Sequence, residues 1–250
     1  MVEEKGPALD GQRAGTGATR LVTRFFFIRN ALSLMNPPQT NRSWNLMSWN
    51  VRGLNSKEKW SEIRDKIIEA NCDIICLQET KKEDFNLAFI RNFCPADFDK
   101  FEFLPSIGAS GGIIIIWKGR LFNGEFIFSN QFAISVEISS RLSDDHWIVT
   151  SVYGPCTSEG KKDFTEWLKQ IQMPDELDWL IVGDFNLMRN TQDRNKGAGD
   201  LAEMFMFNDA ISTLGLNEVT LQGRKFTWST CNRTHFWKSW TGSSLLTLGT

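Results

Sequence analysis

From Trp44 onward the chain alternates short apolar runs with amphipathic stretches, and this alternation limits what it can fold into. Asp73–Glu79, Ile113–Trp117 and Trp179–Asp184 are short runs rich in branched or large apolar residues, so each predicts a buried strand. Further strands are predicted at Leu46–Asn50, Glu125–Phe128, Phe132–Ile138, His146–Tyr153 and from Phe226. A chain with many strands and few helices is expected to form one α/β domain of layered sheets.

Three amphipathic helices are predicted between these strands. The first begins near Asn55-Ser56, which are good caps, and the third ends at Gly215. Their apolar faces consist of Trp60, Ile63, Ile67 and Ile68, then Phe164, Trp167, Leu168 and Ile171, then Phe207, Ala210, Ile211 and Leu214. With 250 residues, 41% of them hydrophobic, the chain can build a real core, and its apolar runs are too short to cross a bilayer.

The charge is unevenly distributed along the chain. The formal net charge of −2 gives no overall nucleic-acid signature, but no acidic residue lies between Gly11 and Lys57. Residues 1–44 lack strand alternation and are expected to form a flexible basic leader. An unselected extension is the favoured interpretation, ahead of an organelle transit peptide or a phosphate-contacting segment, because Glu3, Glu4 and Asp10 are acidic.

The cysteines and histidines exclude several kinds of site. The five cysteines form no CxxC pair, so neither a disulfide framework nor a zinc site is predicted. Most lie in hydrophobic runs, as small core residues do in a reducing compartment. His146 and His235 have no setting typical of nucleophilic catalysis, and we interpret Asp145-His146 as a hairpin turn.

Polar side chains follow several of the predicted strands at the point where each strand ends. Asn50, Glu79, Tyr153 and Asp184 each end an apolar run, and Asn186 lies two residues after Asp184. A carboxylate beside such a run is costly unless it is hydrogen-bonded, paired or bound to metal. If these strands share one end of the sheets, the five side chains converge in one cleft.

Carboxylate and amide oxygens are ligands that a hard cation prefers. Mg²⁺ keeps several waters and takes one or two protein carboxylates, so Glu79 with Asn50 suffices for one site. On extended backbone Asp184 and Asn186 point to the same side and face one ligand. Any one of these positions alone is better interpreted as a solvated turn residue. Four strand ends in succession that each carry such a polar residue favour a site.

The motifs that contain these residues resemble those of a known family. In order they are Trp49–Leu54, Leu77–Thr80, Val152–Pro155 and Gly183–Asn186, together with Ser110–Gly112 and Lys225–Ser229. They are similar to the endonuclease/exonuclease/phosphatase superfamily, most of all to the endonuclease domain of plant LINE-type (non-LTR) retrotransposons. The resemblance covers about Asn45 to Ser229 and implies a four-layer α/β sandwich, with two packed mixed β-sheets flanked by helices.

The resemblance also implies a chemistry, namely divalent-metal-dependent hydrolysis of a phosphodiester in DNA. It implies that Glu79 binds one Mg²⁺ (or Mn²⁺) with Asn50 beside it. Asp184 would orient or deprotonate the attacking water, Asn186 would steady the phosphoryl oxygens, and Tyr153 would contact the phosphate. Contacts to nucleic acid are expected at Arg52, Arg189, Arg194 and Lys196.

The chain departs from the family after Ser229. The family has a later Asp and then a Ser-Asp-His run, whereas no Asp or Glu occurs here after Glu218. The expectation is an incomplete domain at residues 45–230, lacking its last strands, followed by an unrelated tail at 231–250. Such a chain should expose sheet edges and have little or no nuclease activity.

Two other readings stay open, a non-enzymatic remnant with weak nucleic-acid binding and a superfamily phosphatase. The Gly111-Gly112 and Phe226–Ser229 signals count against the phosphatase. Gly108–Gly112 is interpreted as a turn, because a P-loop would have a lysine and a following helix. DNA is the expected partner, with no membrane and no small-molecule cofactor, and the expected location is nuclear or cytoplasmic.

Overall fold

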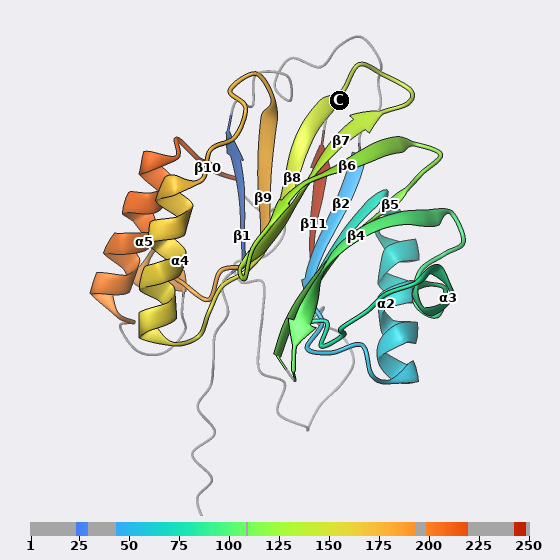
Figure 1. Cartoon of the computed structure of the whole chain (residues 1–250), viewed down its shortest axis with the longest axis horizontal. Helices are drawn as coiled ribbons and strands as arrows, with labels where there is room; N and C mark the ends of the chain where they lie inside the picture. Colours follow the sequence, from blue (N-terminus) through green and yellow to red (C-terminus); the bar gives the residue numbers. More distant parts are fainter. Residues whose placement is uncertain (1–23, 30–43, 109, 194–198, 220–242, 249–250) are drawn as a thin grey trace, which may run out of the picture.

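Two β-sheets pack face to face, and helices cover their outer faces (Figure 1). The structure is a computed structural model that describes residues 24–29, 44–108, 110–193, 199–219 and 243–248. The six-stranded sheet has the order β10 (Asn217–Glu218), β1 (Arg24–Arg29), β9 (Asp178–Asp184), β8 (His146–Tyr153), β7 (Ala133–Ser140) and β6 (Phe122–Ser129). The five-stranded sheet has the order β11 (Ser243–Leu248), β2 (Trp44–Asn50), β3 (Ile74–Gln78), β5 (Ser110–Lys118) and β4 (Phe98–Ile107). The expected four-layer α/β sandwich is confirmed.

Each sheet contains one parallel strand pair joined by a helix. α2 (Lys57–Glu69) connects β2 to β3, and α4 (Ser158–Gln170) connects β8 to β9. A parallel pair needs such a crossover, and it brings the carboxyl ends of both strands to the same edge of the sheet. Both edges carry the polar residues that end the four strands.

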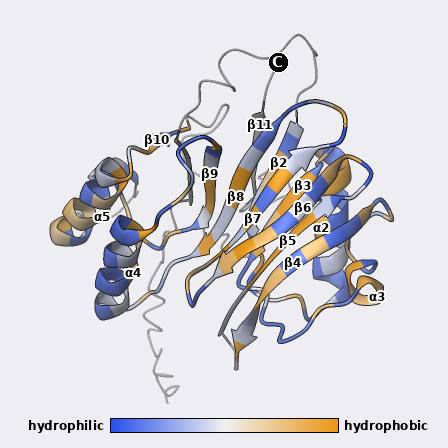
Figure 2. Ribbon diagram, turned by 45° about the horizontal axis from the view of Figure 1, so that its top comes forward, coloured by the Kyte–Doolittle hydropathy of each residue, from blue (hydrophilic) through white to orange (hydrophobic). Residues whose placement is uncertain are grey.

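The core has an inner layer between the sheets and two outer layers beneath the helices. The inner layer includes Leu46, Ile115, Val149 and Val182. α5 (Leu201–Thr213) lies beside α4 over the six-stranded sheet, and α3 (Leu87–Ile90) accompanies α2 over the other. Figure 2 shows the strands as mostly hydrophobic ribbons between helices of mixed hydropathy. The remaining element is a short 3₁₀ turn, η1 (Thr191–Asp193).

Local sequence explains the three long helices. Ser56, Thr157 and Asp200 are their N-caps, and each side chain accepts a backbone N–H of the first turn. Gly215 follows α5 with φ +64°, as expected of a glycine just past a helix end. One detail of the predicted α2 face is wrong, because Ile63 and Ile67 are buried whereas Ile68 is 63% exposed. None of the helices that the structure describes combines the length and the hydropathy of a membrane span.

Two strands lie in segments for which no strand was expected. β1 lies within the predicted leader and pairs along its length with β9, with Phe26 opposite Val182. β11 lies within the predicted tail and pairs with β2, with Leu246 opposite Leu46. β2 and β9 therefore have neighbours on both sides, and the edges are β10 and β6 in one sheet and β11 and β4 in the other. The strand predicted from Phe226 and the residue His235 lie outside the described residues.

The long strand β4 is missing from the sequence-based expectation. It forms the outer edge of the five-stranded sheet and contains Pro105, which is tolerated only where a ladder hydrogen bond is not needed. Its pairing with β5 shifts register between Phe98 and Lys100. This irregularity interrupts the alternation of Phe98, Phe101 and Phe103, so period-two patterning does not reveal the strand.

Candidate active site

The predicted polar residues gather at one end of the sandwich. Asn50 ends β2, Glu79 directly follows β3, and Tyr153 and Asp184 end β8 and β9 as register partners. A hydrogen bond of 2.6 Å from Asn50 Nδ2 to Asp184 Oδ2 joins the two sheets here. The structure thus brings together side chains that are up to 134 residues apart in sequence.

Asp184 is fully buried, and its carboxylate is held from two directions. Asn50 Nδ2 donates to Oδ2, and the backbone N–H of Asn186 donates to Oδ1 at 3.2 Å. The Asn186 side chain donates in turn to the carbonyl of Gly154 at 2.7 Å. A buried carboxylate needs such partners, and these hold it in one orientation.

Glu79 and Tyr153 form the second contact across the sheets. The Tyr153 hydroxyl and the Glu79 carboxylate interact across the sheets, and both side chains are half-buried. Burial raises the pKa of the Tyr153 phenol above its ordinary value of 10.0, and the negative charges of Glu79 and Asp184 raise this pKa further. Tyr153 is therefore a neutral hydrogen-bond donor at physiological pH.

The backbone is strained where the chain leaves these strands. Arg52, Glu79, Lys81 and Asn186 all have φ between +51° and +56°, in the left-handed region that non-glycine residues rarely adopt. Only one other described non-glycine residue, Asn71 after α2, has a positive φ. Strained positions of this kind cluster at functional sites, where the surrounding structure compensates for them.

A pair of glycines supports the segment that carries Glu79. The N–H of Thr80 donates to Gly112 O at 3.1 Å, and the N–H of Lys81 donates to Gly111 O at 3.0 Å. A Cβ on Gly112 would lie 2.3 Å from Thr80 Oγ1, so only glycine allows this close approach. The predicted turn at Gly108–Gly112 is present as the β4–β5 hairpin, and it also braces the strand end that bears Glu79.

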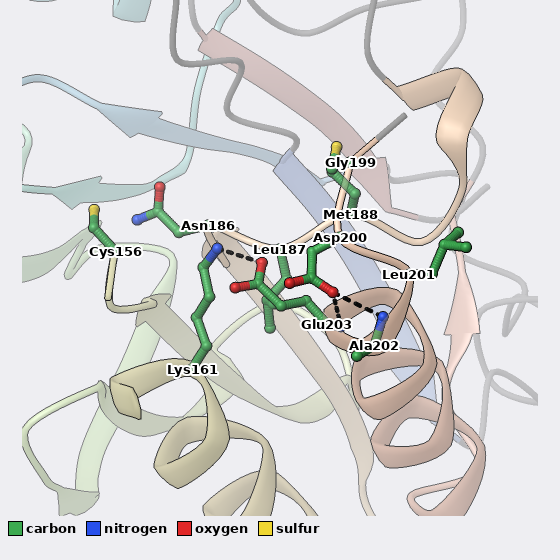
Figure 3. Close-up of a pocket in the computed structure, with 10 residues that line it drawn as sticks. All are labelled: Cys156, Lys161, Asn186, Leu187, Met188, Gly199, Asp200, Leu201, Ala202 and Glu203. Carbon is green, nitrogen blue, oxygen red and sulfur yellow. Dashed lines mark hydrogen bonds and ion pairs between the residues drawn. The ribbon is translucent and has the colours of Figure 1, made fainter. Parts of the chain in front are cut away.

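A cavity of about 780 Å³ lies beside Asn186, at the amino ends of α4 and α5 (Figure 3). Lys161 and Glu203 face each other across it and form an ion pair of 2.6 Å. The lining residues are Cys156, Lys161, Asn186, Leu187, Met188, Gly199, Asp200, Leu201, Ala202 and Glu203. They include two carboxylates for one ammonium group, so the described lining is not a basic phosphate-binding surface.

The comparisons with known proteins agree with this geometry. The sequence profile of the Endonuclease/Exonuclease/phosphatase family matches residues 47–245, most of the chain. The chain belongs to this family. A search of the curated proteins finds no match.

Solved structures of the same fold include two kinds of endonuclease. The endonuclease domain of TRAS1, a telomere-specific non-LTR retrotransposon, has TM-score 0.59 at 11% identity, covering 83% of this chain and 99% of that one. An AP endonuclease from Archaeoglobus fulgidus has TM-score 0.56 at 14% identity, covering 82% and 86%. The AP endonuclease LMAP from Leishmania major has TM-score 0.50 at 14% identity, covering 69% and 67%. At these identities the likeness shows the fold alone.

Endonuclease/exonuclease/phosphatase proteins are metal-dependent hydrolases, and the residues present here fit a hard cation. Glu79 offers a carboxylate and Asn50 an amide oxygen, Oδ1, which also accepts a hydrogen bond from the Arg52 N–H at 3.1 Å. Within the described ranges no three His, Cys, Asp or Glu side chains group as metal ligands. A cation held by few protein oxygens and several waters, as Mg²⁺ usually is, matches this donor set.

The four residues predicted to contact nucleic acid differ in their surroundings. Arg52 is exposed and lies two residues after Asn50, the last residue of β2. The Arg189 guanidinium instead binds Glu218 at 2.6 Å and Asn208 at 2.9 Å, which ties it to β10 and α5. Arg194 and Lys196 lie outside the described residues.

Lys81 is a site residue that sequence reasoning missed. Its Nζ lies 3.2 Å from Glu79 Oε1. In the sequence, Lys81 is recognisable only as a lysine two residues after Glu79. The positive φ angles of both residues bring the ammonium group back to the carboxylate. That geometry is not visible in the sequence, so a cation beside the carboxylate was not expected.

Proposed function

We propose that this chain is a divalent-metal-dependent phosphodiester hydrolase of the DNA-endonuclease type, derived from a non-LTR retrotransposon. The observation that carries the proposal is the hydrogen bond between Asn50 and Asp184, which brings the ends of β2 and β9 together beside Glu79 and Tyr153. The 99% coverage of the TRAS1 domain supports the endonuclease branch. DNA is the proposed substrate and one Mg²⁺ or Mn²⁺ the proposed cofactor.

Glu79 and Asn50 would hold the cation, which when bound polarises the phosphate and neutralises developing negative charge. Asp184 accepts hydrogen bonds from Asn50 Nδ2 and from the Asn186 N–H, which hold its carboxylate in the orientation in which it would orient a water and accept its proton. The Tyr153 hydroxyl, which like any phenol is protonated at neutral pH, can donate to a phosphoryl oxygen. Asn186 Nδ2, now bonded to Gly154 O, is placed to do the same.

We propose further that hydrolysis is slow in these 250 residues. The later Asp and the Ser-Asp-His run of the family are absent, and no carboxylate follows Glu218 to orient a histidine. Removal of one member of a catalytic group that acts as a unit costs orders of magnitude in rate. None of the four described cysteines, Cys72, Cys76, Cys94 and Cys156, is in a disulfide, which fits an intracellular, nuclear or cytoplasmic, location.

A plasmid-nicking assay with Mg²⁺ tests the proposal. It compares this chain, Glu79→Ala, the exposed control Glu83→Ala, and a version carrying the family's C-terminal segment. We expect faint nicking by this chain, loss in Glu79→Ala only, and strong nicking by the extended version. Nicking that survives Glu79→Ala contradicts the site assignment. Absence of nicking from both the chain and its extended version, with salt-sensitive DNA binding retained, would favour a non-enzymatic remnant.

A further inference from the structure

Among the described residues, three polar contacts cross from one sheet to the other near the site. Two of them, Asn50 with Asp184 and Tyr153 with Glu79, involve atoms that the proposed mechanism uses. The third links Gln78, the last residue of β3, to Ser151 on β8, with 2.9 Å between Nε2 and Oγ. No reacting group belongs to this third pair.

The Gln78 amide is fully buried in the mainly apolar layer between the sheets, next to the buried hydroxyls of Ser48 and Ser151. Its Nε2 lies 2.9 Å from Ser151 Oγ, 3.1 Å from Ser48 Oγ and 3.2 Å from Cys76 O. Burying an amide costs free energy that hydrogen bonds only offset, so packing alone would be served as well by an apolar side chain.

The place of the pair explains what it can do. Gln78 directly precedes Glu79, and Ser151 is two residues before Tyr153, on the same face of β8. The Gln78–Ser151 hydrogen bond therefore lies deeper between the two sheets than the contact between Glu79 and Tyr153, and directly next to it. Because Glu79 is held at φ +55°, the direction of its carboxylate depends on where β3 ends.

We propose that Gln78 is a positioning residue, whose hydrogen bond to Ser151 fixes Glu79 against the opposite sheet and thereby strengthens divalent-cation binding. This inference rests on the proposed function, and it assigns part of the cation affinity to a residue that never touches the cation. Buried groups that orient metal ligands typically change affinity by about 10- to 100-fold when removed.

A second buried polar group provides a matched control. Thr150 lies next to Ser151 on β8, is equally buried, and accepts from Trp179 Nε1 at 2.8 Å. Its hydroxyl also bonds Ser135 Oγ at 2.6 Å, so both contacts stay within the six-stranded sheet. Thr150→Val removes buried hydrogen bonds without affecting a link between the sheets.

The test is Mn²⁺ binding to the full chain, followed by the electron paramagnetic resonance signal of the free ion. The variants are Gln78→Met, Ser151→Ala, their double mutant, Thr150→Val and Glu79→Gln, with melting temperatures recorded for all. We expect Gln78→Met and Ser151→Ala each to weaken Mn²⁺ binding about 10-fold or more. The double mutant should bind no more weakly than the weaker single, because both substitutions remove the same Gln78–Ser151 hydrogen bond. Thr150→Val should lower the melting temperature and leave the affinity unchanged.

Three outcomes overturn the inference, and they are distinguishable. If Gln78→Met and Ser151→Ala bind Mn²⁺ like the wild type while Glu79→Gln does not, only the role of Gln78 is wrong. If Thr150→Val weakens binding as much as they do, the effect is general destabilisation. If Glu79→Gln binds like the wild type, or the wild type binds no Mn²⁺, the proposed function falls with it. Should Gln78→Met fail to fold, Ser151→Ala decides alone.

Discussion

Asn50 and Asp184 end strands in different sheets, yet the side-chain amide of one donates to the carboxylate of the other at 2.6 Å. The contact is buried and joins β2 to β9, so it belongs to the core as well as to the site. Any change at Asn50 is therefore expected to affect stability together with metal-dependent chemistry.

Asn50→Ala should lower the free energy of unfolding by about 2–3 kcal/mol, because a fully buried carboxylate loses one of its donors. Urea denaturation measures this loss. Asn45→Ala is the matched control on the same strand, since Asn45 Nδ2 donates to Asn71 O at an exposed position, and about 1 kcal/mol or less is expected. Equal losses from the two variants would show that the carboxylate does not depend on Asn50.

The single tyrosine of the chain makes its titration directly observable. Burial and then the Glu79 charge raise the Tyr153 pKa, so the rise of tyrosinate absorbance should come above the ordinary value of 10.0. Glu79→Gln removes the charge but not the burial, so the midpoint should fall and still lie above that value. The exposed Glu83→Gln should leave it unchanged.

The same shift has a consequence for stability. A group with a raised folded-state pKa stabilises the fold fully below its unfolded pKa, and this contribution is lost as pH rises through the folded pKa. Wild-type stability should thus fall on the alkaline side of pH 10, and fall less steeply in Glu79→Gln. A wild-type phenol that titrates at its ordinary value would contradict the burial of Tyr153 beside Glu79.

The site could be predicted from sequence because its residues interrupt apolar strands. Asn50, Glu79, Tyr153 and Asp184 are each visible as a polar group where a buried run stops, and parallel pairing then brings them to one edge. Gln78 is also a polar residue at a strand end, but the sequence alone indicates only that it belongs to the strand. Its proposed role depends on Ser151, which lies opposite in the other sheet.

The missing strands have a different cause. β4 escapes period-two patterning because of its bulge and Pro105, and β1 and β11 are paired through their backbones with β9 and β2. Backbone pairing between segments far apart in sequence leaves little trace in composition. The sequences of the predicted leader and tail therefore give no indication of β1 and β11. Helical spacing alone predicts that Ile68 lies on the buried face of α2, whereas in the structure its side chain is exposed to solvent.

Asp178, at the start of β9, predicts a pH dependence on the acidic side. Burial raises the pKa of its carboxyl group from 3.8 to about 6. The native state therefore holds a proton that the unfolded chain releases, and stability should decline as pH rises from about 4 to about 6. Asp178→Asn should flatten this decline and be more stable at neutral pH, on the order of 1–2 kcal/mol.

Chemical denaturation of both proteins at several pH values measures the difference. Glu176→Gln, an exposed carboxylate on the same segment, is the control and should follow the wild type. A neutral-pH stability of Asp178→Asn at or below that of the wild type would mean that the carboxylate is compensated in the fold.

Gly111 and Gly112 allow the strain of a backbone angle to be separated from a collision. Both have positive φ, +75° and +85°, so alanine at either position costs about 1–2 kcal/mol. A Cβ on Gly111 meets nothing within 4 Å, whereas one on Gly112 would lie 2.3 Å from Thr80 Oγ1. Gly112→Ala should therefore destabilise the protein by a further 1–3 kcal/mol or so, and should displace Glu79.

A second substitution tests the cause. Thr80 Oγ1 is buried and has no hydrogen-bond partner among the described residues, so Thr80→Ala removes the obstacle without breaking a hydrogen bond. The pair Gly112→Ala/Thr80→Ala should recover most of this additional loss and the Mn²⁺ affinity of Gly111→Ala, with a remainder because the new Cβ still lies 3.2 Å from Ser106 Cβ. If Thr80→Ala does not relieve Gly112→Ala, then the hairpin does not hold Glu79 through Thr80, and the backbone contacts at Gly111 and Gly112 must act alone.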